Sequence, residues 1–183
     1  IIPFFFNYEK KVETIKSYFK ENYDFEIKDY ENIKYKAFPF PSLELKRAQL
    51  KFLNSNANFY VDQLKVYPTV LSIYNLNHFE ANKIIFKGNV VRLKTSKFYI
   101  FVDQLFKQKK KISFNDLNLK ILNNNQIMLV FENIFFSNFG YKKNFVEGKV
   151  FGKNFQVELG DNLRSIKLKI LNSGINTDLD LNE

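Results

Sequence analysis

The chain has 183 residues but no cysteine, no tryptophan, one methionine and one histidine. Without cysteine it can form no disulfide, thiolate metal site or cysteine nucleophile. The single histidine, His78, stands between Asn77 and Phe79 without a serine or carboxylate motif beside it, which favours a structural role over catalysis. No other nucleophile, base or metal-ligand cluster is recognisable. We therefore expect no catalytic residue, no metal and no cofactor.

What the chain does contain is typical of one folded domain over residues 1–183. Hydrophobic residues make up 45% of it and charged residues 26%, and the hydrophobic set includes 22 Phe and 10 Tyr. Phenylalanine and tyrosine favour pleated surfaces, and each buries a large apolar area. The composition therefore indicates a strand-rich protein with an aromatic core.

The formal net charge of +9 indicates an anionic partner, either nucleic acid or a membrane surface. The lysines are scattered except for one cluster, which we interpret as a loop between strands: Lys107, Lys109, Lys110 and Lys111. This cluster is either a solvated loop or a site of contact with lipid headgroups or phosphate.

The N-terminal segment changes character at residue 7. Residues 1–6 are apolar, and six residues cannot span a bilayer, which needs about 20 in a helix. They are either the end of a membrane anchor or a strand packed on the domain. From Asn7 to Asn22 the apolar side chains have the spacing of one helical face, which predicts an amphipathic helix.

From Phe25 onward the apolar residues alternate with polar ones, which predicts many short antiparallel strands over 25–183. A turn rich in proline precedes the strand that begins near Leu43, and its residues are Phe38, Pro39, Phe40 and Pro41. Proline lacks a backbone donor, so this turn must lie at a strand entrance or a sheet edge. A bulge near Arg47 and Ala48 would reverse the faces of that strand.

The expected fold is mainly β (α+β), in which the N-terminal helix precedes a long, curved antiparallel sheet that forms a groove or half-barrel. The apolar positions that would line the groove are Leu43, Leu45, Ile84, Phe86, Leu117, Leu119, Ile121, Phe155, Val157, Leu159, Ile166, Leu168 and Ile170. Such a face can shelter acyl chains while headgroups stay in water. The pattern by itself favours the alternative, a closed core under the helix.

The order of these features resembles the N-terminal part of the AsmA family. The similarity rests on the helix, the Phe38 to Pro41 turn, and degenerate strand motifs such as Val61-Asp-Gln-Leu64 and Ile84-Ile-Phe86, with a helical step expected near Tyr67 to Leu71. Thr69 and Tyr74 depart from the residues expected in that step. The resemblance implies a periplasmic protein that is anchored to the inner membrane and belongs to a longer chain with further β modules.

Members of this family are related to bridge-like lipid transfer proteins, and no catalytic residues come with the family. The resemblance therefore implies that phospholipid is the partner and that it moves toward the outer membrane of a Gram-negative bacterium. The alternative is a basic, aromatic sheet that binds nucleic acid by stacking bases. Because the sequence contains no RNA-binding signature, we expect no nucleic acid partner.

Overall fold

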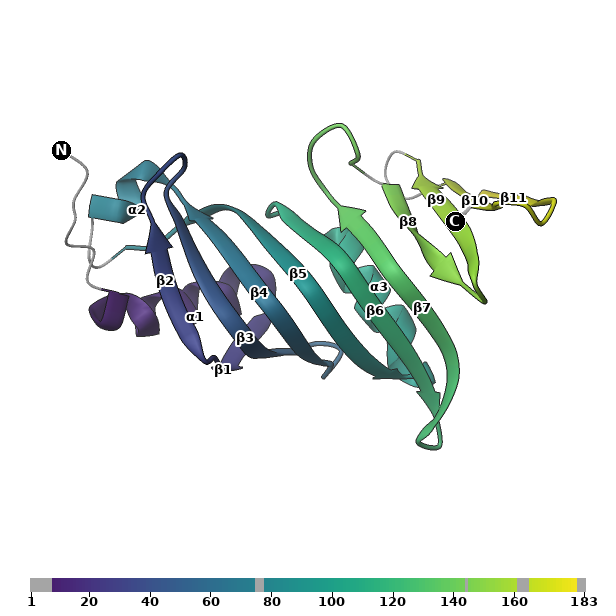
Figure 1. The fold of residues 1–183 in the computed structure, drawn as a ribbon, viewed down its shortest axis with the longest axis horizontal. Helices are drawn as coiled ribbons and strands as arrows, with labels where there is room; N and C mark the ends of the chain where they lie inside the picture. The colour runs from purple at the N-terminus through teal and green to yellow at the C-terminus, as the bar shows by residue number, and fades with distance from the viewer. Residues whose placement is uncertain (1–7, 75–77, 144, 161–164, 181–183) are drawn as a thin grey trace.

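The computed structural model describes residues 8–74, 78–143, 145–160 and 165–180, which form three helices and one open sheet of eleven strands (Figure 1). This confirms the mainly β fold with an N-terminal helix. In chain order the elements are α1 (Tyr8–Tyr23), β1 (Phe25–Asp29), β2 (Asn32–Lys36), β3 (Ser42–Phe52), β4 (Asn58–Pro68), α2 (Val70–Tyr74), β5 (Ala81–Lys94), α3 (Thr95–Lys107), β6 (Ile112–Asn123), β7 (Gln126–Ser137), β8 (Phe145–Val150), β9 (Lys153–Leu159), β10 (Ser165–Ile170) and β11 (Ile175–Asp180).

The strands follow one another across the sheet in the order β1-β3-β4-β5-β6-β7-β8-β9-β10-β11, and β2 pairs with β3. The expectation of a purely antiparallel sheet is wrong at one place, because β5 and β6 run parallel. Two adjacent parallel strands need a crossover connection. Helix α3 provides that crossover between Lys94 and Ile112.

Helix α1 matches the helix predicted over Asn7 to Asn22 to within one residue at each end. Its buried side is aromatic. The ring of Phe19 stacks on that of Phe25 in β1 with 5.0 Å between the centroids, and it also contacts Phe79. Residues 1–6, interpreted as the end of an anchor, lie outside the described residues. Within the described part of the chain, no helix is long and apolar enough to cross a bilayer.

Helix α3 lies where the sequence analysis predicts sheet, so that prediction is wrong for residues 95–107. Phe101 anchors the helix, because its ring packs against Phe52 of β3 and Phe59 of β4 at centroid distances of 5.7 and 5.6 Å. Both α1 and α3 cover the same face of the sheet and are drawn behind it in Figure 1. We call this the inner face.

The inner face stays apolar along each long strand because the side-chain alternation changes phase near the middle. In β3, Leu43 and Leu45 point inward, and so do Ala48 and Leu50 after a shift at Arg47, whose φ is +47°. The change of face expected near Arg47 and Ala48 is therefore present, but it is not a bulge, because β3 and β4 keep one register on both sides of Arg47. Similar shifts accompany residues with positive φ in the neighbouring strands, namely Gly88, Asp116 and Asn133. These residues form a line of kinks across the sheet.

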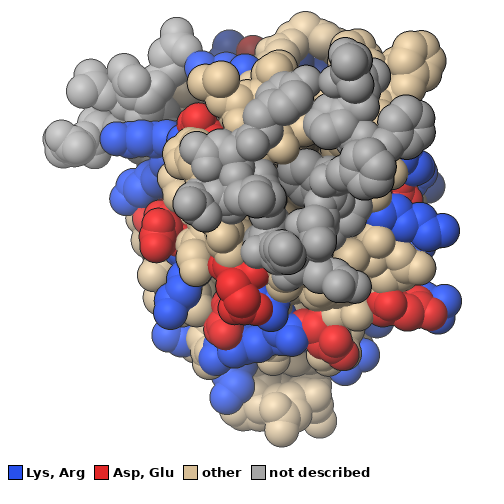
Figure 2. Space-filling view, turned by 90° about the vertical axis from the view of Figure 1, so that its left-hand side faces the viewer, with Lys and Arg blue, Asp and Glu red and all other residues tan. Residues whose placement is uncertain are grey.

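The outer face of β2 to β6 is rich in cations. Alternation and register place the following side chains there: Lys34, Lys36, Lys46, Lys51, Lys65, Lys83, Lys87, Arg92, Lys94 and Lys120. One of the few carboxylates on this face, Glu44, is buried and paired with Lys36. Seen from the end of the molecule that carries α1, positive and negative side chains are interspersed over the described surface (Figure 2).

Candidate functional site: an apolar cavity

A cavity of about 440 Å³ lies on the inner face, between α3 and the C-terminal strands. Strands β6 and β10 both line it, although four strand spacings of a flat sheet would separate them by about 19 Å. The sheet must therefore curl toward α3 to enclose the space. The curl follows from the twist of a long sheet together with the line of kinks.

All nineteen residues around the cavity are apolar. They come from α3, from the five strands β6 to β10 and from the turn after β8: Phe98, Phe101, Val102, Leu105, Phe106, Leu117, Leu119, Phe131, Ile134, Phe136, Val146, Val150, Phe151, Phe155, Val157, Leu159, Ile166, Leu168 and Ile170. No side chain in this wall can donate or accept a hydrogen bond. The cavity can therefore hold hydrocarbon, but it offers nothing to a charged or polar group.

Helix α3 forms one wall of the cavity and the curled strands form the other. Phe98 of α3 lies parallel to Phe131 of β7 with 6.4 Å between the ring centroids, and Phe106 approaches Phe136 at 5.7 Å. On the far wall Val157 and Leu168 are only half-buried, and Phe151 at the β8–β9 turn is largely exposed. Phe98, Val102 and Phe106 of α3 are half-buried as well, so the cavity is partly open to solvent.

Eight of the thirteen groove positions expected from the sequence line this cavity. They are Leu117, Leu119, Phe155, Val157, Leu159, Ile166, Leu168 and Ile170. In the other half of the sheet, Leu43, Leu45, Ile84 and Phe86 are almost completely buried in the core. Ile121 is also buried and does not border the cavity. The two readings of the apolar face, closed core and open groove, therefore each apply to a different part of the sheet.

The sequence analysis missed the contribution of α3 because its aromatic and β-branched residues look like strand. The signal was nevertheless present. Phe98, Phe101, Val102 and Leu105 have the i, i+3, i+4, i+7 spacing of one helical face. All four line the cavity. The half-buried β8 residues Val146 and Val150 were also missed, because a glycine between two apolar residues, here Gly148, is typical of a break between strands.

The lysines proposed for headgroup contact lie at the end of α3, away from the apolar wall. Lys107 forms an ion pair with Asp103 at 2.9 Å, which raises the pKa of Lys107, and Lys110 approaches Glu80 at 3.4 Å. Lys109 and Lys111 are exposed on the loop before β6. Lys107, Lys109 and Lys110 border a separate, polar pocket of about 420 Å³ on the opposite side of α3.

The remaining predicted positions are on the surface. Phe38 and Phe40 are exposed in the loop between β2 and β3, and Pro41 directly precedes β3, as expected for a strand entrance. The peptide bond between Phe38 and Pro39 is cis. His78 is exposed. In the described part of the chain, no group of three or more His, Asp or Glu side chains is arranged to hold a metal ion.

The chain was also compared with known proteins. No protein-family model matches it, and no curated protein matches it at a significant level. The resemblance to the AsmA family therefore stays a prediction that rests on the quoted motifs. The functional argument depends on the cavity itself.

Proposed function

We propose that this protein is a periplasmic lipid carrier, anchored to the inner membrane, that binds phospholipid by its acyl chains in the apolar cavity. Neighbouring β modules of a longer chain would extend the cavity into a path toward the outer membrane, in support of outer-membrane assembly. The observation that carries the proposal is the cavity wall, which is apolar throughout and partly open to solvent.

The driving force is the removal of hydrocarbon from water. Each buried methylene contributes about 0.8 kcal/mol, so an acyl chain of ordinary length can bind without a specific polar contact. Because the wall has no hydrogen-bonding side chain, the phosphate and headgroup have to remain outside in solvent. A carrier built in this way discriminates little between headgroups.

The distribution of aromatic rings favours lipid over nucleic acid. Phe86 and Phe114 stack at 4.6 Å in the core, and most of the other phenylalanine rings also point to the inner face. The basic outer face of β2 to β6 has few exposed rings, Tyr60 among them. Binding of single strands usually combines positive charge with exposed aromatic platforms on one surface. Here the two features lie on opposite faces.

Native mass spectrometry of the protein, followed by lipid extraction, tests the proposal. The wild-type protein should retain phospholipid at a defined stoichiometry. Leu168→Gln places an amide on the cavity wall and should reduce the retained lipid about tenfold. Lys167→Gln is the matched control, because it introduces the same residue at the adjacent position, where the side chain points away from the cavity.

A folded wild-type protein that carries no lipid and takes none up from vesicles would overturn the proposal. Equal lipid content in Leu168→Gln and Lys167→Gln would mean that lipid does not bind in the cavity. Circular dichroism spectra that superimpose for the two variants would exclude unfolding as the reason for any difference.

A further inference from the structure

Four large apolar side chains project into solvent at one end of the sheet. Phe38 is 84% exposed and Phe40 is 70% exposed in the β2–β3 loop, and in α2 Val70 is 68% exposed and Leu71 is 78% exposed. Single exposed apolar residues are common on soluble proteins, but a cluster of them marks an interaction site. We call these four residues the apolar tip.

Strand register brings the two parts of the apolar tip together. Lys36 pairs with Ser42 at the start of β3, and Leu43 pairs with Val66 near the end of β4. The β2–β3 loop and the chain that follows Pro68 therefore begin at the same end of the neighbouring strands β3 and β4. Neighbouring strands are about 4.8 Å apart. Figure 1 shows the loop and α2 at the same end of the sheet.

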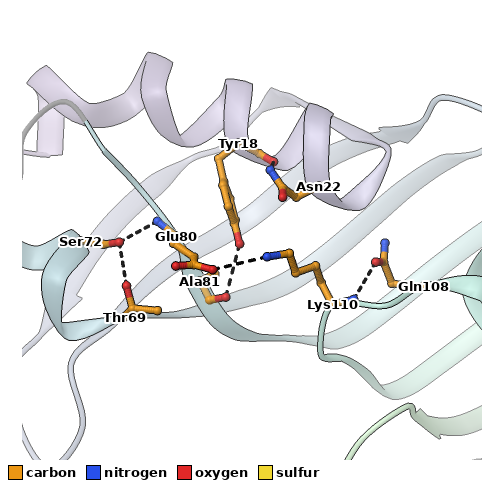
Figure 3. Close-up of polar contacts among 8 residues, drawn as sticks. All are labelled: Tyr18, Asn22, Thr69, Ser72, Glu80, Ala81, Gln108 and Lys110. Carbon is orange, nitrogen blue, oxygen red and sulfur yellow. Dashed lines mark hydrogen bonds and ion pairs between the residues drawn. The ribbon is translucent and has the colours of Figure 1, made fainter.

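The exposure of Val70 and Leu71 is fixed by the residues around them. In the same short helix Ser72 is completely buried and Ile73 is nearly so. The Ser72 hydroxyl lies 2.9 Å from that of Thr69 and accepts a hydrogen bond of 2.7 Å from the backbone N–H of Glu80 (Figure 3). Buried residues thus hold α2 against the domain while its first two side chains point outward.

Lysines lie at the same end of the sheet as the apolar tip. The Lys110 ammonium donates to Glu80, the residue whose N–H holds Ser72, so the lysine-rich loop before β6 lies at this end of the molecule (Figure 3). Lys109 and Lys111 of the same loop are exposed. Lys83 also lies at this end, with its ammonium 4.7 Å from the centre of the Tyr67 ring.

We propose that the apolar tip inserts into the interfacial region of a lipid bilayer that contains anionic lipid, so that the molecule docks end-on. Apolar side chains on protruding turns can enter the headgroup region, and lysines at the same end are attracted by the negative surface potential of the membrane. A protein partner would instead be expected to meet a broader apolar surface. This site is distinct from the apolar cavity and does not depend on it.

Because the chain contains no tryptophan, the fluorescence of one introduced tryptophan reports only on its own surroundings. Phe40→Trp is a single-tryptophan protein with the probe in the apolar tip, and Met128→Trp is the control. Met128 is 61% exposed near the β6–β7 turn, at the opposite end of the strands. Each variant is mixed with vesicles of phosphatidylcholine and phosphatidylglycerol in a ratio of about three to one, which supply the negative surface charge that the lysines need.

The emission of Phe40→Trp should shift to the blue and should be quenched by lipids brominated on the acyl chains, whereas Met128→Trp should show neither change. In a flotation assay with the same vesicles, the double variant Phe38→Ser/Phe40→Ser should bind at least tenfold more weakly, since two phenylalanine side chains no longer leave water. The control double variant Ile127→Ser/Met128→Ser should bind like the wild type.

Unchanged emission of Phe40→Trp, with equal flotation of both double variants, would overturn the proposal. A blue shift that depends on protein concentration and not on vesicles would also overturn it, in favour of contact between copies of the chain. The Leu168→Gln variant distinguishes membrane docking by the apolar tip from lipid binding in the cavity. Its flotation should equal that of the wild type even when its retained lipid is lost, and each proposal can therefore fail without the other.

Discussion

Gly88 shows how a single residue decides the path of the sheet. Its φ is +64°, and a Cβ at this position would lie 2.2 Å from Oδ2 of Asp62 on β4. The positive φ favours glycine here, and an added Cβ would force the exposed Asp62 side chain to move. A glycine between lysine and asparagine is typical of a turn between strands. In the structure β5 continues through it and only changes the phase of its side chains.

Gly88→Ala should therefore lower the free energy of unfolding by about 2 kcal/mol, from backbone strain and from the clash with Asp62. Urea unfolding measures this loss. Gly140→Ala is the matched control, because Gly140 has a φ of +78° and no atom within 4 Å of an added Cβ. It should cost about 1 kcal/mol, from strain alone. Equal losses in the two variants would contradict a role for the contact with Asp62.

Glu44 is the buried carboxylate of the outer face. Its Oε2 lies 2.6 Å from the Lys36 ammonium, and the Gln63 side-chain amide donates to its Oε1. The ion pair and hydrogen bond with Lys36 lower the pKa of Glu44, with a further contribution from Gln63. A lowered pKa in the folded state means that the ionised carboxylate stabilises the fold.

Glu44→Gln should reduce stability by about 1–2 kcal/mol at pH 7, since the hydrogen bonds to a charged acceptor weaken. The difference from wild type should be complete above the unfolded-state pKa of about 4.3 and should shrink as pH falls through the lower folded-state pKa. Urea midpoints between pH 7 and 3 test this. Parallel pH profiles for the two proteins would contradict it. Glu13→Gln, which removes an exposed ion pair with Lys16, should change stability by less than about 0.5 kcal/mol.

At the scale of the element, α3 does most to shape the candidate site. It connects two parallel strands, closes the core over β3 and β4, and presents Phe98 and Val102 to the cavity. Its residues have a moderate preference for strand, so local propensity alone is a poor guide to its structure. Burial of its apolar side against the sheet decides in favour of helix.

Phe101→Ala should cost about 3–5 kcal/mol of unfolding free energy, because it removes a fully buried ring and leaves a void between α3 and the sheet. Tyr99→Ala on the same helix is the control, since Tyr99 is largely exposed, and it should cost less than about 1 kcal/mol. Chemical denaturation of both variants provides the comparison. A small loss for Phe101→Ala would mean that α3 does not depend on this anchor.

At the scale of the whole molecule, the sheet has a covered half and an open half. Helices α1 and α3 cover β1 to β6, where Phe25, Phe59 and Phe86 are completely buried. Strands β8 to β10 turn only one side toward the cavity, and most of their inward residues are half-buried. Stability should therefore fall from the covered half to the open half.

Hydrogen exchange followed by mass spectrometry should show slow exchange in β3 to β6 and faster exchange in β8 to β11, whose backbone hydrogen bonds are covered by fewer apolar contacts. Bound phospholipid should slow exchange in β8 to β10 and leave β3 and β4 unchanged. Uniform protection along the sheet, or a lipid effect confined to β3 and β4, would contradict this division of the molecule.

Much of the fold could be predicted because the relevant signals are local. The spacing of Ile15 and Phe19 indicated a helix, and the alternation around Leu117, Val157 and Leu168 indicated strands with one apolar face. The proline-rich turn was placed at a strand entrance because proline cannot donate to a ladder. These inferences need only the neighbouring residues.

The sequence by itself thus determined that the chain forms a mainly β domain with one apolar face, since periodicity and composition carry that information. Only the tertiary structure decided where this face is closed and where it is open. Leu43 and Leu168 have the same alternating pattern, yet the first is in the core and the second lines the cavity. The difference arises because α1 and α3 pack over one half of the sheet, whereas the strands of the other half curl toward α3 and, in the part of the chain that the structure describes, no helix covers them. Both features depend on contacts between residues far apart in the sequence.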